Sequence, residues 1–547
     1  MAAPPSSLAV EHAEKTLAAE GPDTEKNVTT PASRSANWRF SLTMVSVCLM
    51  AFVASIGSSI ATALPHISNE LQAGQSYVWI ASIYMFAQTA VQPPCAQLCN
   101  IFGRKNPMIV SVLMFAAGSA VAASSKTTVA LIVGRLVQGL ASGCIMMLSE
   151  LIVCDLVPLR ERGKYVGFVL TAIALGTVVG PITSGALAEH HWRWIFYMNI
   201  PVCGIILVIL VLFVNLRYNK EPSWAKAISR IDWVGNTLFC GSACSIMLGI
   251  IPAGNSHPWS SWRTISPIVI GGVCWIATVV FEGSKFCREP AIPPRLFTNR
   301  TSAAGFFMSF MTSICLQWAG FFWPVYFQMR GASPLKSAID LLPFLLFLLP
   351  VAGISGAVMS KIGRYRPLHA VGFVLIILGL GLNTLLKPRT PTGVWIVLQM
   401  INATGQGLVI PTLLPAIMAA LAESDTAVAT GVFSFLRSFG YVWGIVLSSI
   451  IFNNEVTKSV WRIEDSTVRT IFNGGQAYEK ISGGYIETLS PATLSEVLSI
   501  YNESLKTIWW AAVAFGCVGA FGVLIEKHIP LRQKLDTEYG LDDAQVR

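Results

Sequence analysis

The chain has 547 residues, of which 53% are hydrophobic and only 12% are charged, and its mean hydropathy is +0.59. Soluble domains carry about twice this charged fraction, so the composition excludes an ordinary soluble domain and predicts an integral membrane protein. The formal net charge of +9 does not indicate nucleic-acid binding, because the basic residues lie in short loops between apolar runs and form no stripe interleaved with aromatic residues.

The first segment, residues 1–38, is polar and rich in Ala, Pro, Ser and Thr. It has no apolar core of the signal-peptide type, and we interpret it as a disordered cytoplasmic tail. The 12 cysteines form no zinc-type CxxC pair, so neither a disulfide framework nor a metal site is expected. No Gly-rich nucleotide loop of the G-x-x-x-x-G-K-[ST] type is present, and no cofactor is expected.

Apolar runs of about 20 residues, the length that crosses a bilayer, recur through the rest of the chain. This pattern predicts an all-α integral membrane protein with fourteen transmembrane helices. We place them at roughly 40–65, 76–98, 107–124, 127–153, 164–187, 194–215, 232–252, 264–283, 302–327, 337–360, 367–386, 393–421, 427–453 and 506–526.

The loops between these spans predict the orientation. Those that follow spans 2, 4, 6, 8 and 10 hold more than twice as many Lys and Arg residues as the short loops on the other side. The positive-inside rule therefore places both termini in the cytoplasm. One inner loop, "AESDTA" at 422–427, carries no Lys or Arg and is an exception to this pattern.

One outer segment, 454–505, is long and contains the amphipathic stretch "IETLSPATLSEVLSIY". We interpret this stretch as a surface helix packed over the outer mouth of the bundle. The segment also carries the one outward-facing N-x-[ST] sequon, which makes Asn502 a candidate glycosylation site.

An internal repeat divides the chain. "IFGRKNP" (101–107) follows span 2 and "KIGRYRP" (361–367) follows span 10, while Gln-Gly-Leu at 138–140 in span 4 recurs at 406–408 in span 12. Two landmarks at nearly equal offsets indicate duplicated six-span bundles, which are typical of secondary transporters. We expect a first bundle, an inserted pair of spans with its flanking loops, a second bundle and a cytoplasmic tail, at 39–216, 217–300, 301–526 and 527–547.

Several longer stretches resemble the major facilitator superfamily, specifically its fourteen-span drug:proton antiporter family as found in fungi. They are "CDLVPLRERGKYVGF", "GPITSGALAEHHWRWIFYMNIPV", "IDLLPFL", "ESDTAVATGVFSFLRSFG" and "NGGQAYE", and the resemblance covers nearly the whole chain after the tail. It implies a major facilitator fold that exports small molecules in exchange for protons, with the two halves rocking around a mid-membrane site.

The loop after span 2 is similar to the family signature G-x-L-A-D-R-F-G-R-R/K. Gly103, Arg104 and Lys105 match its end, whereas Asn100 replaces the acidic residue. In the family this loop latches the two halves in the outward-facing state. The neutral Asn100 puts part of that latch in doubt.

The span 4 signature of the family, R-x-x-Q-G, is present as Arg135, Gln138 and Gly139. In relatives its arginine is implicated in proton coupling. A guanidinium at membrane depth is costly and marks a functional site by default. The repeat partner of Arg135 is Ala403, so a purely architectural role is disfavoured, although a buried arginine bonded to carbonyls and Gln138 is the alternative.

The span 5 signature of the family, G-x-x-x-G-P-x-x-G-G, is associated with export. It is matched here by Gly176, Gly180, Pro181 and Gly185. Small residues four apart allow two helices to approach closely, so plain packing is the alternative to a functional role. We expect Gly180→Leu to abolish export.

Charged and polar residues within spans supply the remaining candidates. Arg437 lies near mid-depth in span 13, and Asp340 and Glu150 lie toward the outer and inner faces. Interfacial pairing is the alternative for both acids, yet they are the best titratable candidates for proton exchange. Residues that would line a substrate cavity are Gln88, Gln317, Trp318, Tyr326, Asn402 and Gln406, with packing as their alternative.

These features predict a monomeric plasma-membrane exporter of a small hydrophobic toxin, drug or secondary metabolite, driven by protons, with the vacuolar membrane as a second location. The alternative is an importer of amino acids or siderophores, which the span 5 signature disfavours. The substrate is expected to be neutral or anionic, because Arg135 and Arg437 lie deep and no acid lies at comparable depth. An aromatic cage of Trp318 and Tyr326 would instead hold a cation.

Overall fold

The structure is a computed structural model. It describes the residues 38–58, 60, 63–64, 67, 70–71, 77–214, 216, 224–250, 253, 258–285, 287, 289–473 and 489–532. The expected N-terminal tail therefore lies outside the described residues except for Trp38, which begins the first helix. Most of the expected C-terminal tail also lies outside them.

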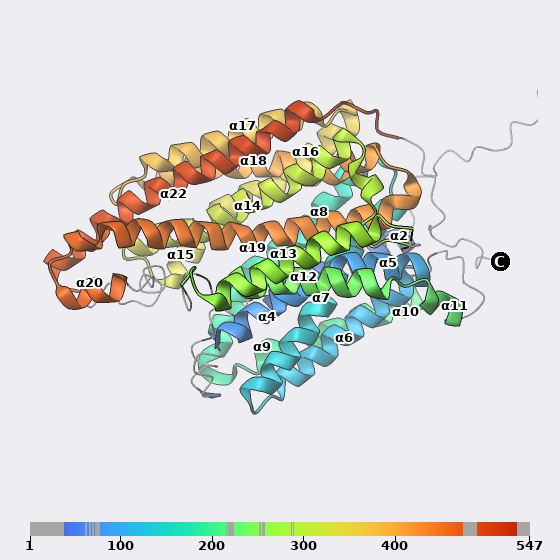
Figure 1. Ribbon diagram of the computed structural model, residues 1–547, viewed down its shortest axis with the longest axis horizontal. Helices are drawn as coiled ribbons and strands as arrows, with labels where there is room; N and C mark the ends of the chain where they lie inside the picture. Colours follow the sequence, from blue (N-terminus) through green and yellow to red (C-terminus); the bar gives the residue numbers. More distant parts are fainter. Residues whose placement is uncertain are drawn as a thin grey trace, which may run out of the picture.

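The first half of the chain forms a bundle of long helices that run side by side (Figure 1). Its helices are α2 (Trp38–Ser58), α4 (Tyr77–Ala90), α5 (Gln92–Phe102), α6 (Lys105–Ala123), α7 (Thr128–Leu156), α8 (Arg162–His191), α9 (Trp194–Tyr197) and α10 (Asn199–Leu212).

The second half forms a matching bundle above the first in Figure 1. Its elements are α14 (Arg300–Met329), α15 (Pro334–Asp340), α16 (Leu342–Ile362), α17 (Arg366–Leu382), η4 (Asn383–Leu385), α18 (Thr392–Ala419), η5 (Glu423–Asp425), α19 (Thr426–Ser459), η6 (Val460–Arg462), α20 (Ser466–Asn473) and α22 (Pro491–Ile525).

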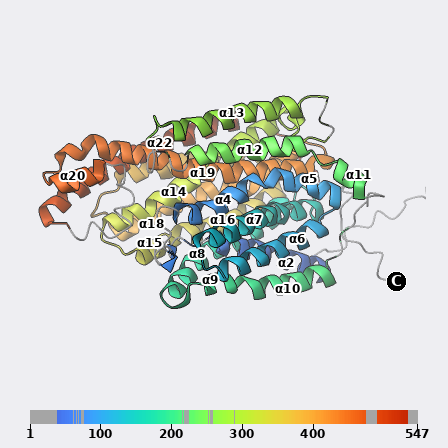
Figure 2. The ribbon, with the colours of Figure 1, turned by 60° about the horizontal axis from the view of Figure 1, so that its bottom comes forward.

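A helix pair between the halves lies on one side of the molecule. It consists of α12 (Trp233–Ile250) and α13 (Trp262–Glu282), which follow the short α11 (Trp224–Ser229) and precede η3 (Pro294–Phe297). Figure 2 shows α13 outermost. Large apolar side chains of α13, including Val273, Ile276 and Val280, are more than 60% exposed, as expected for a helix that faces lipid.

Thirteen of the described helical segments are long and apolar enough to cross a membrane. The fourteenth span consists of α4 and α5, two helices that are separated at Val91. Pro93 and Pro94 follow at once, and because proline has no backbone N–H to donate, the helix is interrupted there. The prediction of an all-α bundle of fourteen transmembrane helices is confirmed.

The internal repeat is visible in the backbone. Gly103 and Gly363, the glycines of the two Gly-Arg loops, have φ of 78° and 70°. Residues other than glycine rarely adopt this left-handed backbone conformation. Each glycine ends one span and is followed by the arginine that precedes the next. The equal placement of these turns supports a duplication of the two halves.

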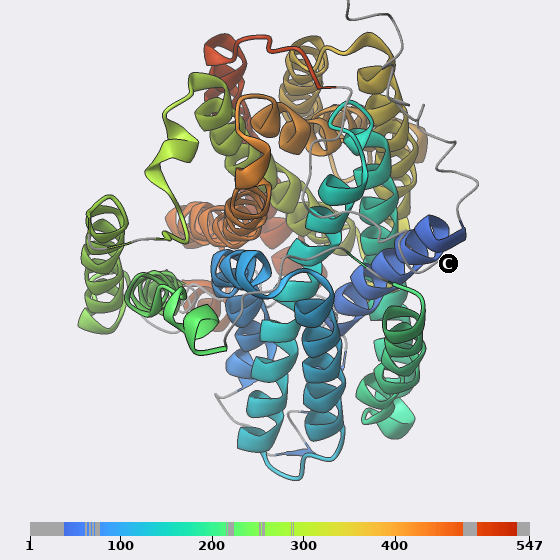
Figure 3. The ribbon, with the colours of Figure 1, turned by 90° about the vertical axis from the view of Figure 1, so that its right-hand side faces the viewer.

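The described chain begins and ends at one end of the bundle, which we call the terminal face; it lies at the right in Figure 1, and Figure 3 looks onto it. At the opposite face α19, α20 and α22 extend beyond the other helices. The interpretation of the long outer segment needs a correction, because residues 491–505 do not form a separate surface helix.

These residues instead continue the last span as one 35-residue helix, α22. The helix begins early because the Ser490 side chain accepts a hydrogen bond from the Thr493 N–H as its N-cap. Its apolar face then stays buried, with Tyr501 against Phe452 and Phe472. The sequon residue Asn502 therefore lies within this extended helix.

Candidate functional site

The loop after the second span is held by Arg104. This side chain is 3% exposed, and its Nε donates to Asp155 Oδ2 at the end of α7, at 2.8 Å. Its Nη1 donates to the Cys99 carbonyl and to the amide oxygen of Asn100, at 2.7 and 3.2 Å. Asp155 thus supplies the carboxylate that Asn100 lacks. Lys105 is directed elsewhere and donates to the Val211 carbonyl.

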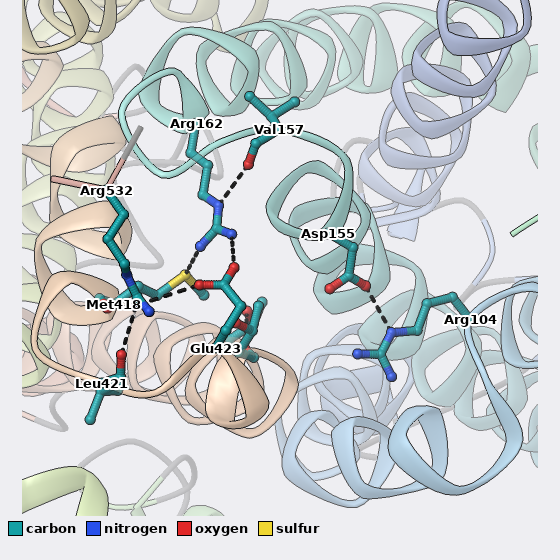
Figure 4. Close-up of polar contacts among 10 residues, drawn as sticks. Arg104, Asp155, Val157, Arg162, Met418, Leu421, Glu423 and Arg532 are labelled. Atoms are coloured by element: carbon teal, nitrogen blue, oxygen red, sulfur yellow. Dashed lines mark hydrogen bonds and ion pairs between the residues drawn. The ribbon is translucent and has the colours of Figure 1, made fainter. Parts of the chain in front are cut away.

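Beside this loop, four residues join the two halves at the terminal face (Figure 4). We call Arg162, Met418, Glu423 and Arg532 the terminal gate. Arg162, in the first half, forms an ion pair with Glu423 and contacts Met418 Sδ, both in the second half. Arg162 is 1% exposed, so this pair is well shielded from solvent.

Arg532 completes the terminal gate from the C-terminal segment. It donates to the carbonyls of Leu421 and Met418 at 2.7 and 3.1 Å, and it lies 3.4 Å from Glu423. The Arg160 backbone N–H in turn donates to the Arg532 carbonyl. The C-terminal segment therefore bridges both halves at this point.

Close backbone contact reinforces the terminal gate. A Cβ atom on Gly356 of α16 would lie 2.5 Å from the backbone of Gly163 of α8. The Arg160 side chain also donates across the interface to the carbonyls of Ser360 and Lys361. The halves are thus packed together toward the terminal face.

The deepest ion pair between the halves joins Glu150 and Arg437. Arg437 Nη1 pairs with Glu150 Oε1, and the Ser434 hydroxyl donates to Glu150 Oε2 at 2.8 Å. Glu150 is 0% exposed and Arg437 is 7% exposed. At 1.5 Å per residue, they lie about 9 and 17 Å from the terminal ends of α7 and α19.

This pair corrects two expectations. Glu150 is fully buried and paired rather than exposed, so Arg437 has an acidic partner although the two residues lie at different distances from the ends of their helices. The positions of these residues along their own helices do not reveal the pairing, because it depends on two long side chains from different helices reaching each other. The expectation of a neutral or anionic substrate now rests on Arg135 alone.

Arg135 lies wholly within the first half and is 0% exposed. Its Nη1 donates to the Gly57 carbonyl at 2.5 Å and lies 3.4 Å from Gln138 Oε1. The guanidinium also covers the ring of Tyr84, with Cζ 4.4 Å from the centroid. Gln138 is held in turn by the Ser119 hydroxyl.

Two donors of Arg135, Nε and Nη2, have no hydrogen-bond partner among the described residues. The sequence places a single acid, Glu70, between Trp38 and Ser149. Its carboxylate accepts from Trp192 and Arg193. Arg135 thus differs from Arg437 in pairing with no described carboxylate.

Glycines of the span 4 and span 5 signatures lie at helix contacts. A Cβ on Gly139 would lie 2.5 Å from the Tyr84 carbonyl oxygen, and one on Gly176 would lie 2.6 Å from the Phe52 carbonyl oxygen. A Cβ on Gly185 would meet nothing within 4 Å. Gly180 and Pro181 lie between them in α8. The first glycine of the span 5 motif therefore lies at a tight helix contact, and the last one does not.

The candidate cavity residues differ in burial and in their partners. Gln88 and Gln317 are half-buried, whereas Asn402 and Gln406 are 0% exposed and have no partner among the described residues. Trp318 and Tyr326, named as an alternative cation cage, have different neighbours: Trp318 packs on Phe515, while the Tyr326 hydroxyl donates to the Lys387 carbonyl. These two residues are eight apart on α14, about 12 Å along the helix.

The other acidic candidate, Asp340, lies at the opposite face. It ends α15 and forms an ion pair with Lys336 at 2.9 Å. It is thus distant from the interface that Glu150 and Arg437 occupy, and it stays a candidate only.

Two groups of paired charges were not predicted from the sequence. Glu423 and Asp425 belong to the loop without Lys or Arg, and they receive Arg162, Arg532 and Arg295 from neighbouring loops. The absence of Lys and Arg from this loop was the signal in the sequence that its acids bind arginines of other loops.

The second group is the pair of His369 and Glu526, both buried, with His369 Nδ1 3.0 Å from the carboxylate. His369 Nε2 lies 3.1 Å from the Thr412 hydroxyl. The only sign of this pair in the sequence was the presence of a titratable residue, His369, near the end of a span.

Comparison with known proteins agrees with this architecture. The sequence profile of the Major Facilitator Superfamily matches residues 47–445. The MFS efflux transporter aclA of Aspergillus oryzae is 44% identical over 93% of both chains. The efflux pump FUS6 of Gibberella moniliformis is 40% identical over 94% of this chain and 92% of its own.

Among solved structures, the human organic anion transporter MFSD10 has a similar fold. The TM-score is 0.55 at 13% identity, over 87% of this chain and 98% of that one. With the two-bundle architecture and its repeated Gly-Arg turns, these matches show that the chain is a membrane transporter that belongs to the major facilitator superfamily.

Proposed function

We propose that this transporter exports a small hydrophobic compound, such as a toxin, drug or secondary metabolite, in exchange for protons. Alternating access moves the two halves about the interface that contains Glu150 and Arg437. We place the monomer in the plasma membrane with the terminal face in the cytoplasm, as the basic loops indicate. The efflux names of the relatives support export over import of amino acids or siderophores.

The observation that carries proton exchange is the ion pair between Glu150 and Arg437. It joins the halves in a buried setting, where removing one charge leaves the other uncompensated. Protonation of Glu150 from the outside therefore weakens the closed cytoplasmic side. Loss of that proton to the cytoplasm, as substrate binds, restores the pair and returns the protein to the state closed on that side.

The substrate class follows from Arg135. A buried guanidinium with two unpaired donors favours an uncharged or weakly acidic compound with oxygen acceptors, because a desolvated cation would need a charge partner. A weakly acidic polyketide-like or terpenoid compound meets this requirement.

The test is transport direction in sealed vesicles that contain the purified protein in known orientation. With the inside of inside-out vesicles made acidic, we expect a fluorescent hydrophobic acid to accumulate and vesicle pH to rise in step. Accumulation only in right-side-out vesicles under the opposite gradient would favour import.

A further inference from the structure

A hollow of about 690 Å³ lies between α2 and α8, on the outside of the first half. Its size is within the range of about 300–1,000 Å³ that is usual for small-ligand pockets. Its lining is almost entirely apolar, and Val45, Phe168 and Leu175 are each about half exposed. All the lining residues belong to α2 and α8 of the first half, so the hollow opens at the surface of that half.

The shape of this hollow follows from the crossing of α2 and α8. The helices touch where Gly176 meets Phe52 and where the Ser55 hydroxyl donates to the Ile173 carbonyl. From this contact to Phe40, at the terminal end of the lining, α2 rises about 18 Å. One hydrocarbon leaflet is roughly 15 Å thick, so the hollow spans a single leaflet.

Two cations stand at the terminal end of the hollow. Lys164 is exposed, and its Nζ lies 5.7 Å from the ring centroid of Tyr165, which lines the hollow and packs on Phe40. Arg39 directly precedes Phe40, and its guanidinium lies 5.5 Å from the ring centroid of Trp38. α2 lies at the right-hand periphery in Figure 3, so lipid headgroups have access to this end.

We propose that this hollow, the α2–α8 groove, binds an anionic phospholipid from the leaflet at the terminal face. An acyl chain fills the apolar lining, and the phosphate and headgroup carboxylate or second phosphate contact Lys164 and Arg39. Basic pockets between transmembrane helices on the cytoplasmic side are suited to such headgroups. Assigning the leaflet rests on the cytoplasmic placement proposed above.

The groove is connected to the functional residues through α2. The lipid chain would brace the α2–α8 crossing at Gly176, and α2 also presents the Gly57 carbonyl to Arg135. An occupied groove thus holds α2 in the position in which that hydrogen bond forms. We expect transport to be faster in membranes that contain anionic lipid.

The test is lipid retention, measured by native mass spectrometry after equimolar phosphatidylserine and phosphatidylcholine are added to the purified full-length protein. Each cation near the membrane surface contributes about a five-fold preference for anionic lipid. We expect phosphatidylserine to be retained preferentially, Lys164→Gln to reduce the preference about five-fold, and Val45→Trp to reduce retention of both lipids.

Matched controls are Lys285→Gln, an exposed lysine also at the terminal face, and Val273→Trp, a lipid-facing residue of α13. Both controls should retain lipid as the unchanged protein does. Equal retention of the two lipids, controls that act like the groove variants, or retention of a transported compound in place of lipid would overturn the proposal. Because lipid is counted directly, failure here differs from failure to export.

Discussion

Glu150 of α7 and Arg437 of α19 form a buried ion pair across the interface between the two halves, 287 residues apart in the chain. It lies deeper than the terminal gate and is strengthened by the Ser434 hydroxyl. A conformational change that separates the halves must therefore break a desolvated charge pair. Neutralising one partner by protonation lowers the energy needed.

Removing one partner of this pair should destabilise the protein. For Arg437→Ala we expect a loss of about 3–5 kcal/mol in the free energy of unfolding, because Glu150 is left as an uncompensated buried charge. The double change Glu150→Gln with Arg437→Gln should cost less than Arg437→Ala alone. Denaturant unfolding of the purified protein measures both, and a double variant less stable than the single one would contradict the buried-pair account.

The terminal gate should open when its acid is neutralised. In Glu423→Gln, Arg162 and Arg532 lose their charged partner, and we expect residues at the gate to become several-fold more accessible from the terminal side. A cysteine introduced at Ser360, in a background without reactive cysteines, reports this through its labelling rate by a water-soluble maleimide. Glu161→Gln is the control, because Glu161 is exposed beside Arg162. Equal labelling in both variants would remove Glu423 from the gate.

The span 5 motif should be sensitive at its first glycine and tolerant at its last. Gly176→Leu forces a side chain into the Phe52 carbonyl, so we expect loss of efflux, whereas Gly185→Leu has open space and should transport normally. Efflux and surface level of the two variants are compared in the same host. Loss of efflux in both would mean that the motif acts through something other than helix contact.

Arg135 should be required for turnover and not for folding. Arg135→Lys keeps the charge but cannot form the planar contacts with Gly57 and Tyr84. We therefore expect normal surface levels with at least ten-fold slower efflux, a loss of about 1.4 kcal/mol in transition-state stabilisation. Full transport by Arg135→Ala would show that the guanidinium is only structural.

The charge of the substrate gives a separate prediction. In a host that lacks its own pumps, the protein should protect against acidic and neutral hydrophobic toxins more than against lipophilic cations of similar size. The physical reason is that Arg135 pairs with no carboxylate among the described residues. Selective protection against the cations would contradict it.

The fold could be predicted from the sequence because helices that face lipid require long apolar runs. Long apolar runs predicted fourteen spans, and the helix of the last one begins well before the predicted residue 506, because Ser490 and a buried apolar face extend it outward. The Gly-Arg repeat could also be recognised in the sequence, because Gly103 and Gly363 both adopt a positive φ that favours glycine.

The contacts between residues of the candidate site could not be predicted from the sequence in the same way. Sequence periodicity shows which face of a helix is apolar but not which residue of another helix it meets. The partnerships of Glu150 with Arg437 and of Arg162 with Glu423 depend on how the two halves are docked. The one sequence clue, an inner loop without positive charge, is explained once its acids are seen to bind arginines of other loops.

The most direct test of the central claim is proton-coupled efflux by Glu150→Gln in sealed vesicles, with transported compound and internal pH recorded together. The account predicts that the unchanged protein accumulates the compound against its gradient when a pH gradient is imposed. Glu150→Gln should retain binding, show no gradient-driven accumulation and move no protons. If Glu150→Gln still couples proton movement to accumulation as the unchanged protein does, Glu150 is not the proton-exchanging group and the account is wrong.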